Sequence, residues 1–304
     1  MNLRDLHYLI AVADLRSFVQ AAERCFISQP TLSTQIKKLE DGLGVQIFER
    51  SNKRVLLTEI GEQVVISARR ILQEVEQVKQ LAEHAGDPLA GNLRIGAFPT
   101  LSTYIFPPLV PLIRQQFPKA RLILLEEKTE ELIKQLKNAQ IDMALLALPV
   151  PDESLQRAVL FDDEFLLAVA ADHPLANLNK IAQTDLAGQQ LLLLDEGHCL
   201  RGQALQICQI NSADEQQDVR ATSLETLRQM VRAGTGITFM PRIAIGPGDD
   251  GIRYIPFASP APSRSIGLVW RKTSARGKLI TAMAGLIKQV AAELSTAQEH
   301  KQNN

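Results

Sequence analysis

Alternation of strands and helices along most of the chain constrains its fold more than any other feature. Apolar runs typical of buried strands occur at residues 92–97, 120–126 and 141–148, and helical patterns at residues 104–116 and 129–139 separate them. A second series follows, with strands expected near residues 164–170, 190–194, 219–221, 236–241, 252–255 and 265–270. The first series predicts parallel strands. The two series together predict an α/β domain over residues 91–297 with two subdomains around a cleft.

Two helices complete the predicted domain. Thr222 and Glu225 have the spacing of a capping box, which predicts a helix over residues 224–233. A second helix over residues 279–294 ends the pattern, and the polar residues 298–304 are expected to form a disordered tail.

Two cysteines stand close together in the second series, in the stretch LLLLDEGHCLRGQALQIC. Cys199 follows a buried strand, and His198 or Arg201 beside it could lower the pKa of its thiol and favour the reactive thiolate. If residues 200–209 are helical, the α-carbons of Cys199 and Cys208 lie roughly 13 to 14 Å apart, whereas a disulfide needs about 7 Å or less. A disulfide would therefore require the helix to unwind, as in a conformational switch. The alternative is a pair of inert core cysteines.

The first 58 residues have the pattern of a compact unit of short helices. Ser28 before Pro30 is a good N-cap for a third helix, whose Leu32, Ile36 and Leu39 would face inward. The outer face is polar and suits hydrogen bonds to base edges and phosphates in a major groove. The candidate DNA-contacting residues of this helix are Ser28, Gln29, Pro30, Thr31, Ser33, Thr34 and Lys37.

After this helix, residues 45–50 and 55–57 read as two short strands joined by a polar turn. Such a hairpin would form a wing, and it would place Arg50, Lys53 and Arg54 beside the phosphate backbone. The alternative is a helical cap with a solvated charged turn. Cys25 lies among apolar neighbours and is expected to be a core thiol.

One long helix is predicted from residue 59 to residue 87. Small and apolar residues recur at steps of three and four, which indicates a heptad seam; they are Gly61, Val64, Ala68, Ile71, Val75, Val78 and Ala82. The seam favours a dimer over a helix packed only on its own domain, because no long neighbouring element is left to cover it.

Composition excludes several classes of protein. The 304 residues carry a formal net charge of -1, so contact with nucleic acid must be local. No apolar run reaches the 18 residues of a membrane span, and Arg4 and Asp5 argue against a secretory signal, so a cytoplasmic location is expected. Three cysteines are too few for a disulfide framework. The histidines are scattered, so neither a metal nor another cofactor is expected.

Four stretches resemble a known family. The run FVQAAERCFISQPTLSTQIKKLEDGLGVQIFERSNKRVLLTEIG resembles the winged helix-turn-helix of LysR-type transcriptional regulators. The stretches GHCLRGQALQIC, ATSLETLRQMVRAGTGITFMP and RSIGLVWR are similar to a hydrogen-peroxide-sensing branch of that family, and the resemblance covers essentially the whole chain. It implies a cytoplasmic transcriptional activator with a DNA-binding domain over residues 1–58, a dimerisation helix over 59–87 and a periplasmic-binding-protein-like regulatory domain over 91–297.

The resemblance also implies roles for individual residues. Cys199 matches the peroxidatic cysteine, which is oxidised to a sulfenic acid, and Cys208 matches the resolving cysteine that closes the disulfide. The residues implied at the peroxide-binding pocket are Thr100, Thr129, His198, Arg201 and Arg264. The implied partners are double-stranded promoter DNA, a second dimer of the same chain, RNA polymerase, hydrogen peroxide as signal, and glutaredoxin or thioredoxin as reductant.

Gly202 departs from the pattern, because an acidic residue is expected at this position. Other interpretations remain open for the pocket: Thr100 and Thr129 could be helix N-caps, and His198 and Arg264 could be ordinary loop and surface residues. A LysR-type regulator of a small organic effector, with inert thiols, is the alternative function. A thiol peroxidase is a third, although a helix-turn-helix favours a regulator that is not an enzyme.

Overall fold

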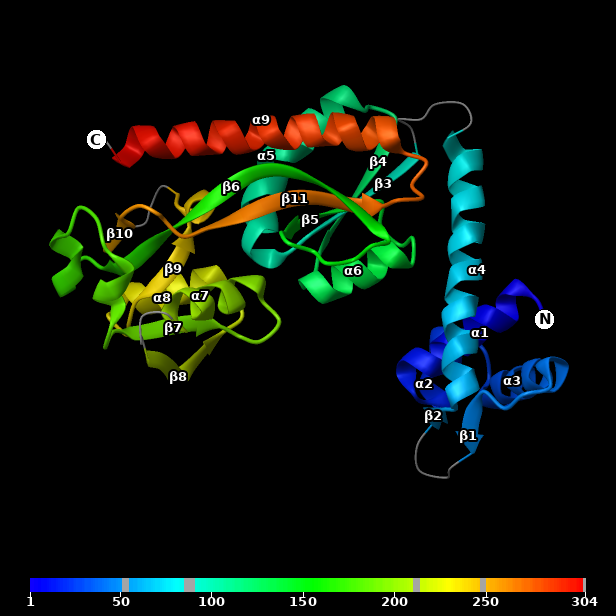
Figure 1. Cartoon of the computed structure of the whole chain (residues 1–304). Coiled ribbons are helices and arrows are strands. Elements are labelled where there is room, and N and C mark those ends of the chain that lie inside the picture. The colour runs from blue at the N-terminus through cyan, green and yellow to red at the C-terminus, as the bar shows by residue number, and fades with distance from the viewer. Residues whose placement is uncertain (51–54, 85–90, 210–213, 247–249, 303–304) are drawn as a thin grey trace. The chain divides into compact units, whose positions relative to one another are not determined.

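The computed structural model describes residues 1–50, 55–84, 91–209, 214–246 and 250–302. Within these ranges, the side chains at residues 50, 77, 79–84, 208–209, 214–220 and 297–302 are outside the description. The chain divides into two compact units, Met1–Ala82 and Glu83–Asn304 (Figure 1).

The first unit is mainly helical and carries a small β-hairpin. Its elements are α1 (Leu3–Leu15), α2 (Phe18–Arg24), α3 (Gln29–Leu43), β1 (Phe48–Arg50), β2 (Val55–Leu57) and α4 (Glu59–His84). Helix α3 begins as predicted, because the hydroxyl of Ser28 accepts a hydrogen bond from the backbone N–H of Thr31 at 3.3 Å. Leu32, Ile36 and Leu39 are buried in the core of the unit, as the sequence predicted.

Helix α4 corrects part of the prediction for the heptad seam. The hydroxyl of Thr58 caps the helix by accepting from the backbone N–H of Gly61, and a Cβ atom at Gly61 would collide with the carbonyl oxygen of Ile47. Gly61 and Ala68 are therefore buried against their own unit, which covers the first half of the seam. Further along, Ile71 is 40% and Val78 is 64% exposed. Among the described side chains of the seam, Ile71 and Val78 are therefore left largely free of the core of the first unit.

The second unit is an α/β domain with short 3-10 turns, η1–η3. Its elements are β3 (Gly91–Ala97), α5 (Pro99–Gln116), β4 (Ala120–Glu126), α6 (Thr129–Lys137), β5 (Met143–Ala147), β6 (Leu155–Ala170), η1 (Pro174–Asn177), η2 (Gln183–Leu186), β7 (Gln190–Leu194), α7 (Cys199–Gln209), β8 (Asp214–Ala221), α8 (Leu224–Arg232), β9 (Thr238–Pro241), η3 (Arg242–Ala244), β10 (Ile252–Pro256), β11 (Ser263–Arg271) and α9 (Gly277–Gln302).

The strands of the first series, β3, β4 and β5, are parallel as predicted, but four of the seven strand pairings described in this unit are antiparallel. Strand β3 pairs in parallel with β4 and β5, and β7 pairs in parallel with β8. Strands β9, β10 and β11 all run antiparallel to β6, and β11 also runs antiparallel to β5. The physical reason is the chain path: β6 carries the chain out of the first half of the unit and β11 brings it back, so these neighbours must point in opposite directions.

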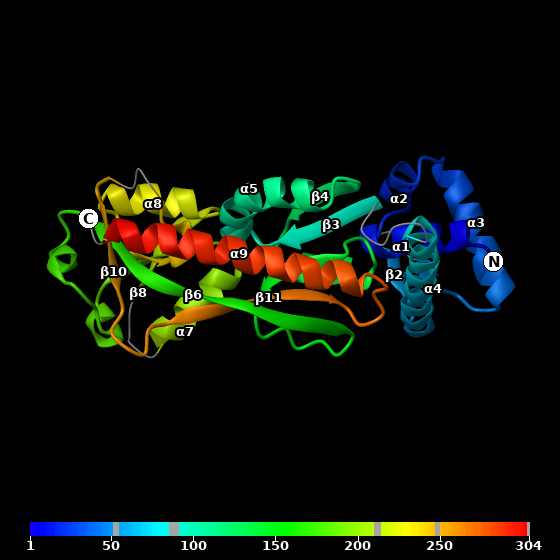
Figure 2. The same ribbon diagram turned by 90° about the horizontal axis from the view of Figure 1, so that it is seen from above.

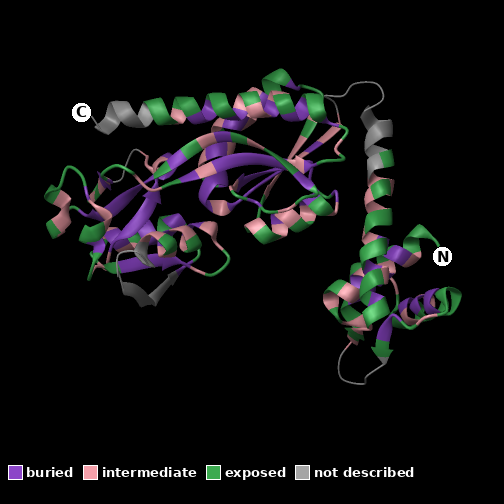
Figure 3. Cartoon of the chain, in the orientation of Figure 1, coloured by how far each residue is buried: buried purple, intermediate pink, exposed green. Residues whose placement is uncertain are grey.

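Two hydrophobic cores confirm the prediction of two subdomains. One core packs around β3, β5, α5 and α6, and the other around β7, β9 and α8. The long strands β6 and β11 pass from one half to the other (Figure 2). Most of their residues are buried (Figure 3), and α9 lies along β6 and packs on α5 and η3. The two halves therefore share a continuous hydrogen-bonded sheet.

Two local predictions in this unit need correction. The N-cap of α8 is Ser223, whose hydroxyl accepts from the N–H of Thr226 at 3.2 Å, so Thr222 and Glu225 do not form the cap. Glu225 instead forms an ion pair with Arg228 at 3.0 Å. At the C-terminus, α9 continues to Gln302, beyond the predicted start of a disordered tail, because the Ala, Gln, Glu and Lys residues there are good helix formers.

Candidate functional site

Cys199 is the first residue of α7 and lies where the two halves of the second unit meet. Its side chain is partly buried against the core of the first half, whereas Leu200 and Ala204, further along α7, belong to the core of the second. The thiol is free. The Cys199 sulfur therefore lies at the boundary between the two cores.

Arg264, on β11, is the cation that acts on this thiol. Burial raises the pKa of the Cys199 thiol, while the charge of Arg264 and hydrogen bonds from Arg264 and from the N–H of Leu200 act in the opposite direction. The prediction that His198 or Arg201 would lower this pKa was wrong. The cation whose charge opposes the effect of burial comes from a strand more than 60 residues away in the sequence.

The guanidinium of Arg264 is fully buried and held on several sides. It donates to the hydroxyl of Thr100 at 2.8 Å and to the Thr100 carbonyl at 3.1 Å. Its Nε donates to Asp163 at 3.0 Å, directly across the β11–β6 pairing, and its Cζ lies 5.1 Å from the centre of the Phe98 ring. Such a buried, paired and stacked arginine is rigid. The interpretation of Arg264 as a surface charge was therefore wrong.

Neither candidate threonine is a helix cap. The N-cap of α5 is Phe98 and that of α6 is Lys128, so Thr100 and Thr129 both lie inside their helices. The helices follow neighbouring parallel strands, because β3 pairs with β4 and their ends meet at Ala97 and Glu126. The Thr129 hydroxyl is buried and has no hydrogen-bond partner among the described residues. A buried hydroxyl without a partner is a natural place for a small polar ligand.

His198 and Arg201 lie on either side of Cys199. Burial and the nearby charge of Lys128 lower the pKa of His198, while Asp195 and Glu126 act in the opposite direction. Arg201 donates from Nη1 to the carbonyl of Leu194 at 3.1 Å, which ties the start of α7 to the end of β7.

Both redox-candidate cysteines belong to one continuous helix, because α7 spans Cys199–Gln209. Nine residues of helix place the two α-carbons roughly 13 to 14 Å apart, beyond the roughly 7 Å that a disulfide permits. The side chain of Cys208 lies outside the described residues. Gly202, in the same helix, is exposed, and a Cβ atom there would meet nothing within 4 Å.

The candidate DNA-binding surface is the outer face of α3. Gln29 donates to the hydroxyl of Ser33 at 3.0 Å, and Thr34 donates to the carbonyl of Pro30 at 2.8 Å, so these polar groups are held in place on one face. Thr31 and Lys37 are exposed on the same helix. The candidate wing residues Lys53 and Arg54, and the side chain of Arg50, lie outside the described residues.

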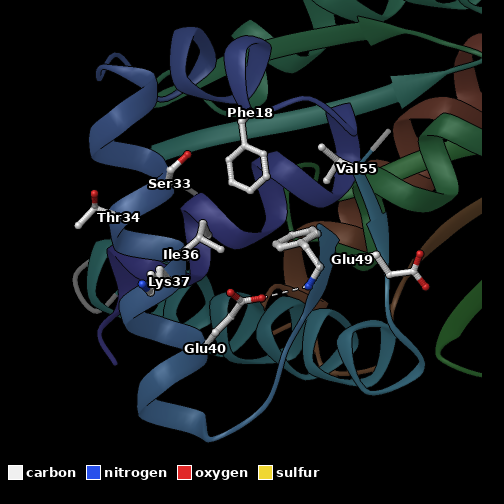
Figure 4. A pocket seen from close by; sticks show the side chains of 9 residues that line it. Phe18, Ser33, Thr34, Ile36, Lys37, Glu40, Glu49 and Val55 are labelled. Carbon is white, nitrogen blue, oxygen red and sulfur yellow. Dashed lines mark hydrogen bonds between the residues drawn. The ribbon is translucent and has the colours of Figure 1, made fainter. Parts of the chain in front are cut away.

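A groove of about 390 Å³ separates α3 from the hairpin (Figure 4). Its lining residues are Phe18, Ser33, Thr34, Ile36, Lys37, Glu40, Phe48, Glu49 and Val55. At its base, the buried carboxylate of Glu40 accepts from the backbone N–H groups of Ile47 and Phe48, at 2.8 and 3.1 Å. Glu40 therefore fixes β1 to α3. The sequence prediction missed it, because an acidic residue on a polar helix gives no signal that it is buried.

None of the described helices is long and apolar enough to cross a membrane. Within the described ranges, no three His, Cys, Asp or Glu side chains are grouped so that they could hold a metal ion.

Comparison with known proteins assigns the chain to a class. Residues 3–62 match the bacterial regulatory helix-turn-helix proteins of the LysR family, and residues 86–292 match the LysR substrate binding domain. The chain therefore belongs to the LysR family of DNA-binding transcriptional regulators.

Within the family, the similarity is to OxyR proteins. The chain is 47% identical over 276 residues to the DNA-binding transcriptional dual regulator OxyR of Escherichia coli K12, covering 90% of each chain. It is 44% identical over 305 residues to the hydrogen peroxide-inducible genes activator of Pectobacterium carotovorum, covering 99% of this chain and 97% of the relative. A solved structure of a Corynebacterium glutamicum OxyR variant with hydrogen peroxide bound matches with a TM-score of 0.68 and 32% identity, covering 99% and 96% of the two chains.

Proposed function

We propose that this protein is a peroxide-sensing transcriptional activator, switched by a reversible disulfide between Cys199 and Cys208. The observation that carries the proposal is the free Cys199 thiol at the first turn of α7, under the charge of the buried Arg264 and at the junction of two subdomains. The names of the similar proteins, among them a peroxide-inducible genes activator and a peroxide-bound OxyR, support the same assignment.

The proposed chemistry has two steps. The Cys199 thiolate attacks one oxygen of hydrogen peroxide, the O–O bond breaks, and the second oxygen leaves as hydroxide and takes up a proton to become water. The Cys208 thiolate then attacks the Cys199 sulfur of the resulting sulfenic acid, the S–O bond breaks, and a second water is released as the disulfide forms. A dithiol reductant such as glutaredoxin or thioredoxin restores both thiols by exchange.

The pocket residues fall into two groups, those proposed to stabilise charge at the sulfur and those proposed to hold the peroxide. We propose that Arg264 and Thr100, joined by two hydrogen bonds, stabilise the thiolate and the oxygen that leaves. The unpartnered hydroxyl of Thr129 and the neutral form of His198 are proposed to hold the peroxide. Peroxide binding by Arg201 stays a prediction; its hydrogen bond to Leu194 supports a role in fixing the start of α7.

The disulfide would act as a switch because α7 must lose helical structure to bring the cysteines together. The helix packs on the second core through Leu200 and Ala204, so unwinding it would release that packing and change how subunits contact one another. We propose that this change alters the spacing of paired DNA-binding units on promoter DNA.

On the DNA side, we propose that α3 enters the major groove and that the hairpin carries Arg50, Lys53 and Arg54 beside the backbone. Dimerisation is proposed through the second half of the seam on α4, where Ile71 and Val78 are exposed. Pairing of two such dimers and contact with RNA polymerase complete the proposed activator, which is not an enzyme.

Mass spectrometry with thiol trapping tests the proposal. Reduced protein is exposed briefly to about one equivalent of hydrogen peroxide, and we expect a peptide linked between Cys199 and Cys208. The Cys208→Ser variant should instead accumulate a trappable sulfenic acid at Cys199. Cys25 provides an internal control, because burial raises the pKa of its thiol and it should stay reduced. If Cys199 and Cys208 also stay reduced, the proposal fails and a small organic effector becomes the leading alternative.

A further inference from the structure

Lys128 joins the start of α6 to the turn that precedes Cys199. Its Nζ donates a hydrogen bond to the carbonyl of Glu196 at 2.6 Å, across 68 positions of sequence. Lys128 belongs to the first half of the second unit, as the N-cap residue of α6, and its side chain makes no cap hydrogen bond there. Glu196 belongs to the turn that leads from β7 into α7. The contact therefore spans the same junction as Cys199.

Gly197 shows how closely the lysine side chain approaches this turn. Its φ is +85°, which favours glycine, and a Cβ atom there would lie 2.9 Å from Cδ and 3.1 Å from Nζ of Lys128. The methylene chain of Lys128 thus lies directly against the backbone of Gly197. A second, independent contact between lysine and turn therefore supports the hydrogen bond to Glu196.

Three charged groups face His198, the residue after Gly197. Lys128 approaches from the start of α6, Glu126 from the end of β4, and Asp195 from the end of β7. Burial lowers the pKa of His198 most, the charge of Lys128 lowers it further, and the two carboxylates act in the opposite direction. Removal of the lysine charge would leave His198 facing two carboxylates and would favour the imidazolium form.

We propose that Lys128 is a positioning residue for the reaction at Cys199, holding the Glu196–His198 turn against α6 and supplying the positive charge beside the imidazole. This inference rests on the proposed peroxide-sensing function. In it, Lys128 touches neither peroxide nor the sulfur; it acts through the turn and through His198. Because Lys128 is exposed, the contact is expected to have a modest energy.

Three variants of the full-length protein test the role of Lys128. Lys128→Met keeps the length of the side chain and removes both the charge and the donor, whereas Lys128→Arg keeps both. Lys134→Met is the matched control, since Lys134 is an exposed lysine on α6 and pairs with Glu131, one turn away on the same helix, at 3.4 Å.

The first readout is the titration of the His198 imidazole by NMR in reduced protein, with its signal assigned by its absence in His198→Gln. The second is the rate of Cys199 modification against pH, by peroxide and separately by iodoacetamide. In Lys128→Met we expect the pKa of His198 to rise. We also expect both rates near pH 7.5 to fall roughly three- to tenfold and their pH dependence to move to higher pH, because a freed turn no longer holds the backbone N–H of Leu200 against the Cys199 thiolate. Lys128→Arg and Lys134→Met should stay close to wild type.

The inference is overturned if Lys128→Met has the same His198 pKa and the same Cys199 modification rates as wild type, even if Cys199 reacts with peroxide as proposed. Failure of the proposed function gives a different result, in which wild-type Cys199 does not react with peroxide at all. The histidine titration and the iodoacetamide rate then still decide the role of Lys128, because neither depends on peroxide.

Discussion

Arg264 donates hydrogen bonds to both the hydroxyl and the carbonyl oxygen of Thr100, at 2.8 and 3.1 Å, and so joins residues 164 positions apart. Thr100 lies in the first turn of α5, in one half of the second unit, and Arg264 lies on β11, which crosses between the halves. The same guanidinium acts on the sulfur of Cys199. The reactivity of the thiol is therefore linked to how the two halves are held together.

Loss of Arg264 should destabilise the second unit strongly. Arg264→Gln leaves the carboxylate of Asp163 buried without its cation, at a cost of about 3 to 5 kcal/mol. The double variant with Asp163→Asn removes both charges and should recover part of that loss. Urea unfolding followed by fluorescence of Trp270, the sole tryptophan, reports on this unit. Equal stability of the single and double variants would contradict the assigned pairing.

The stability of the reduced protein should depend on the ionisation of Cys199. Because burial raises the pKa of this thiol, the unfolded chain loses the proton at a lower pH than the folded chain. The stabilisation that the protonated thiol gives to the folded state is fully present below the ordinary thiol pKa of about 8.5. It falls as the pH rises toward the folded pKa, by at most about 1.4 kcal/mol per pH unit. We expect the unfolding free energy of wild type to decline relative to that of Cys199→Ser as the pH is raised across this range. A difference that grows with pH would mean that the folded pKa is lowered.

Gly202 should make α7 easier to unwind. It is exposed within a helix, with open space for a Cβ atom, so Gly202→Ala should stabilise α7 by about 1 kcal/mol. The proposed disulfide can form only if α7 unwinds, so the variant loses this extra helix stability when it is oxidised. The equilibrium constant for disulfide formation, measured against a dithiol buffer, should therefore fall roughly fivefold. Gly285→Ala, at an exposed and open position of α9, is the control and should leave the equilibrium unchanged. An unchanged equilibrium in Gly202→Ala would show that α7 stays helical when the disulfide forms.

Substitutions on α3 should separate base recognition from phosphate binding. Gln29→Ala should weaken binding to a specific operator by about 1 to 3 kcal/mol while leaving nonspecific binding nearly unchanged. Lys37→Ala should weaken both by a similar factor and reduce the salt dependence by about one phosphate contact. Fluorescence anisotropy with specific and random duplexes over a salt series measures both effects. The roles are reversed if Lys37→Ala changes specificity and Gln29→Ala changes the salt slope.

Local patterns in the sequence predicted most of the elements. The N-cap of α3 at Ser28, strand β4 at Ala120–Glu126 and strand β7 at Gln190–Leu194 were all predicted correctly, because each depends on residues a few positions apart. The cap of α8 was assigned one residue too early, at Thr222 in place of Ser223, since both side chains can cap a helix and only the backbone path decides between them.

The sequence by itself determined most of the helical and extended segments, the winged helix-turn-helix pattern and the nine-residue spacing of the cysteines, because these features are local. Only the tertiary structure decided that Arg264, and neither His198 nor Arg201, is the cation acting on Cys199, that Thr100 is its partner, and that Lys128 holds the turn before α7. Each of these contacts joins residues more than 60 positions apart. The physical reason is that such contacts depend on the direction and register of β6 and β11, which are set when the two cores pack together and which no short stretch of sequence encodes.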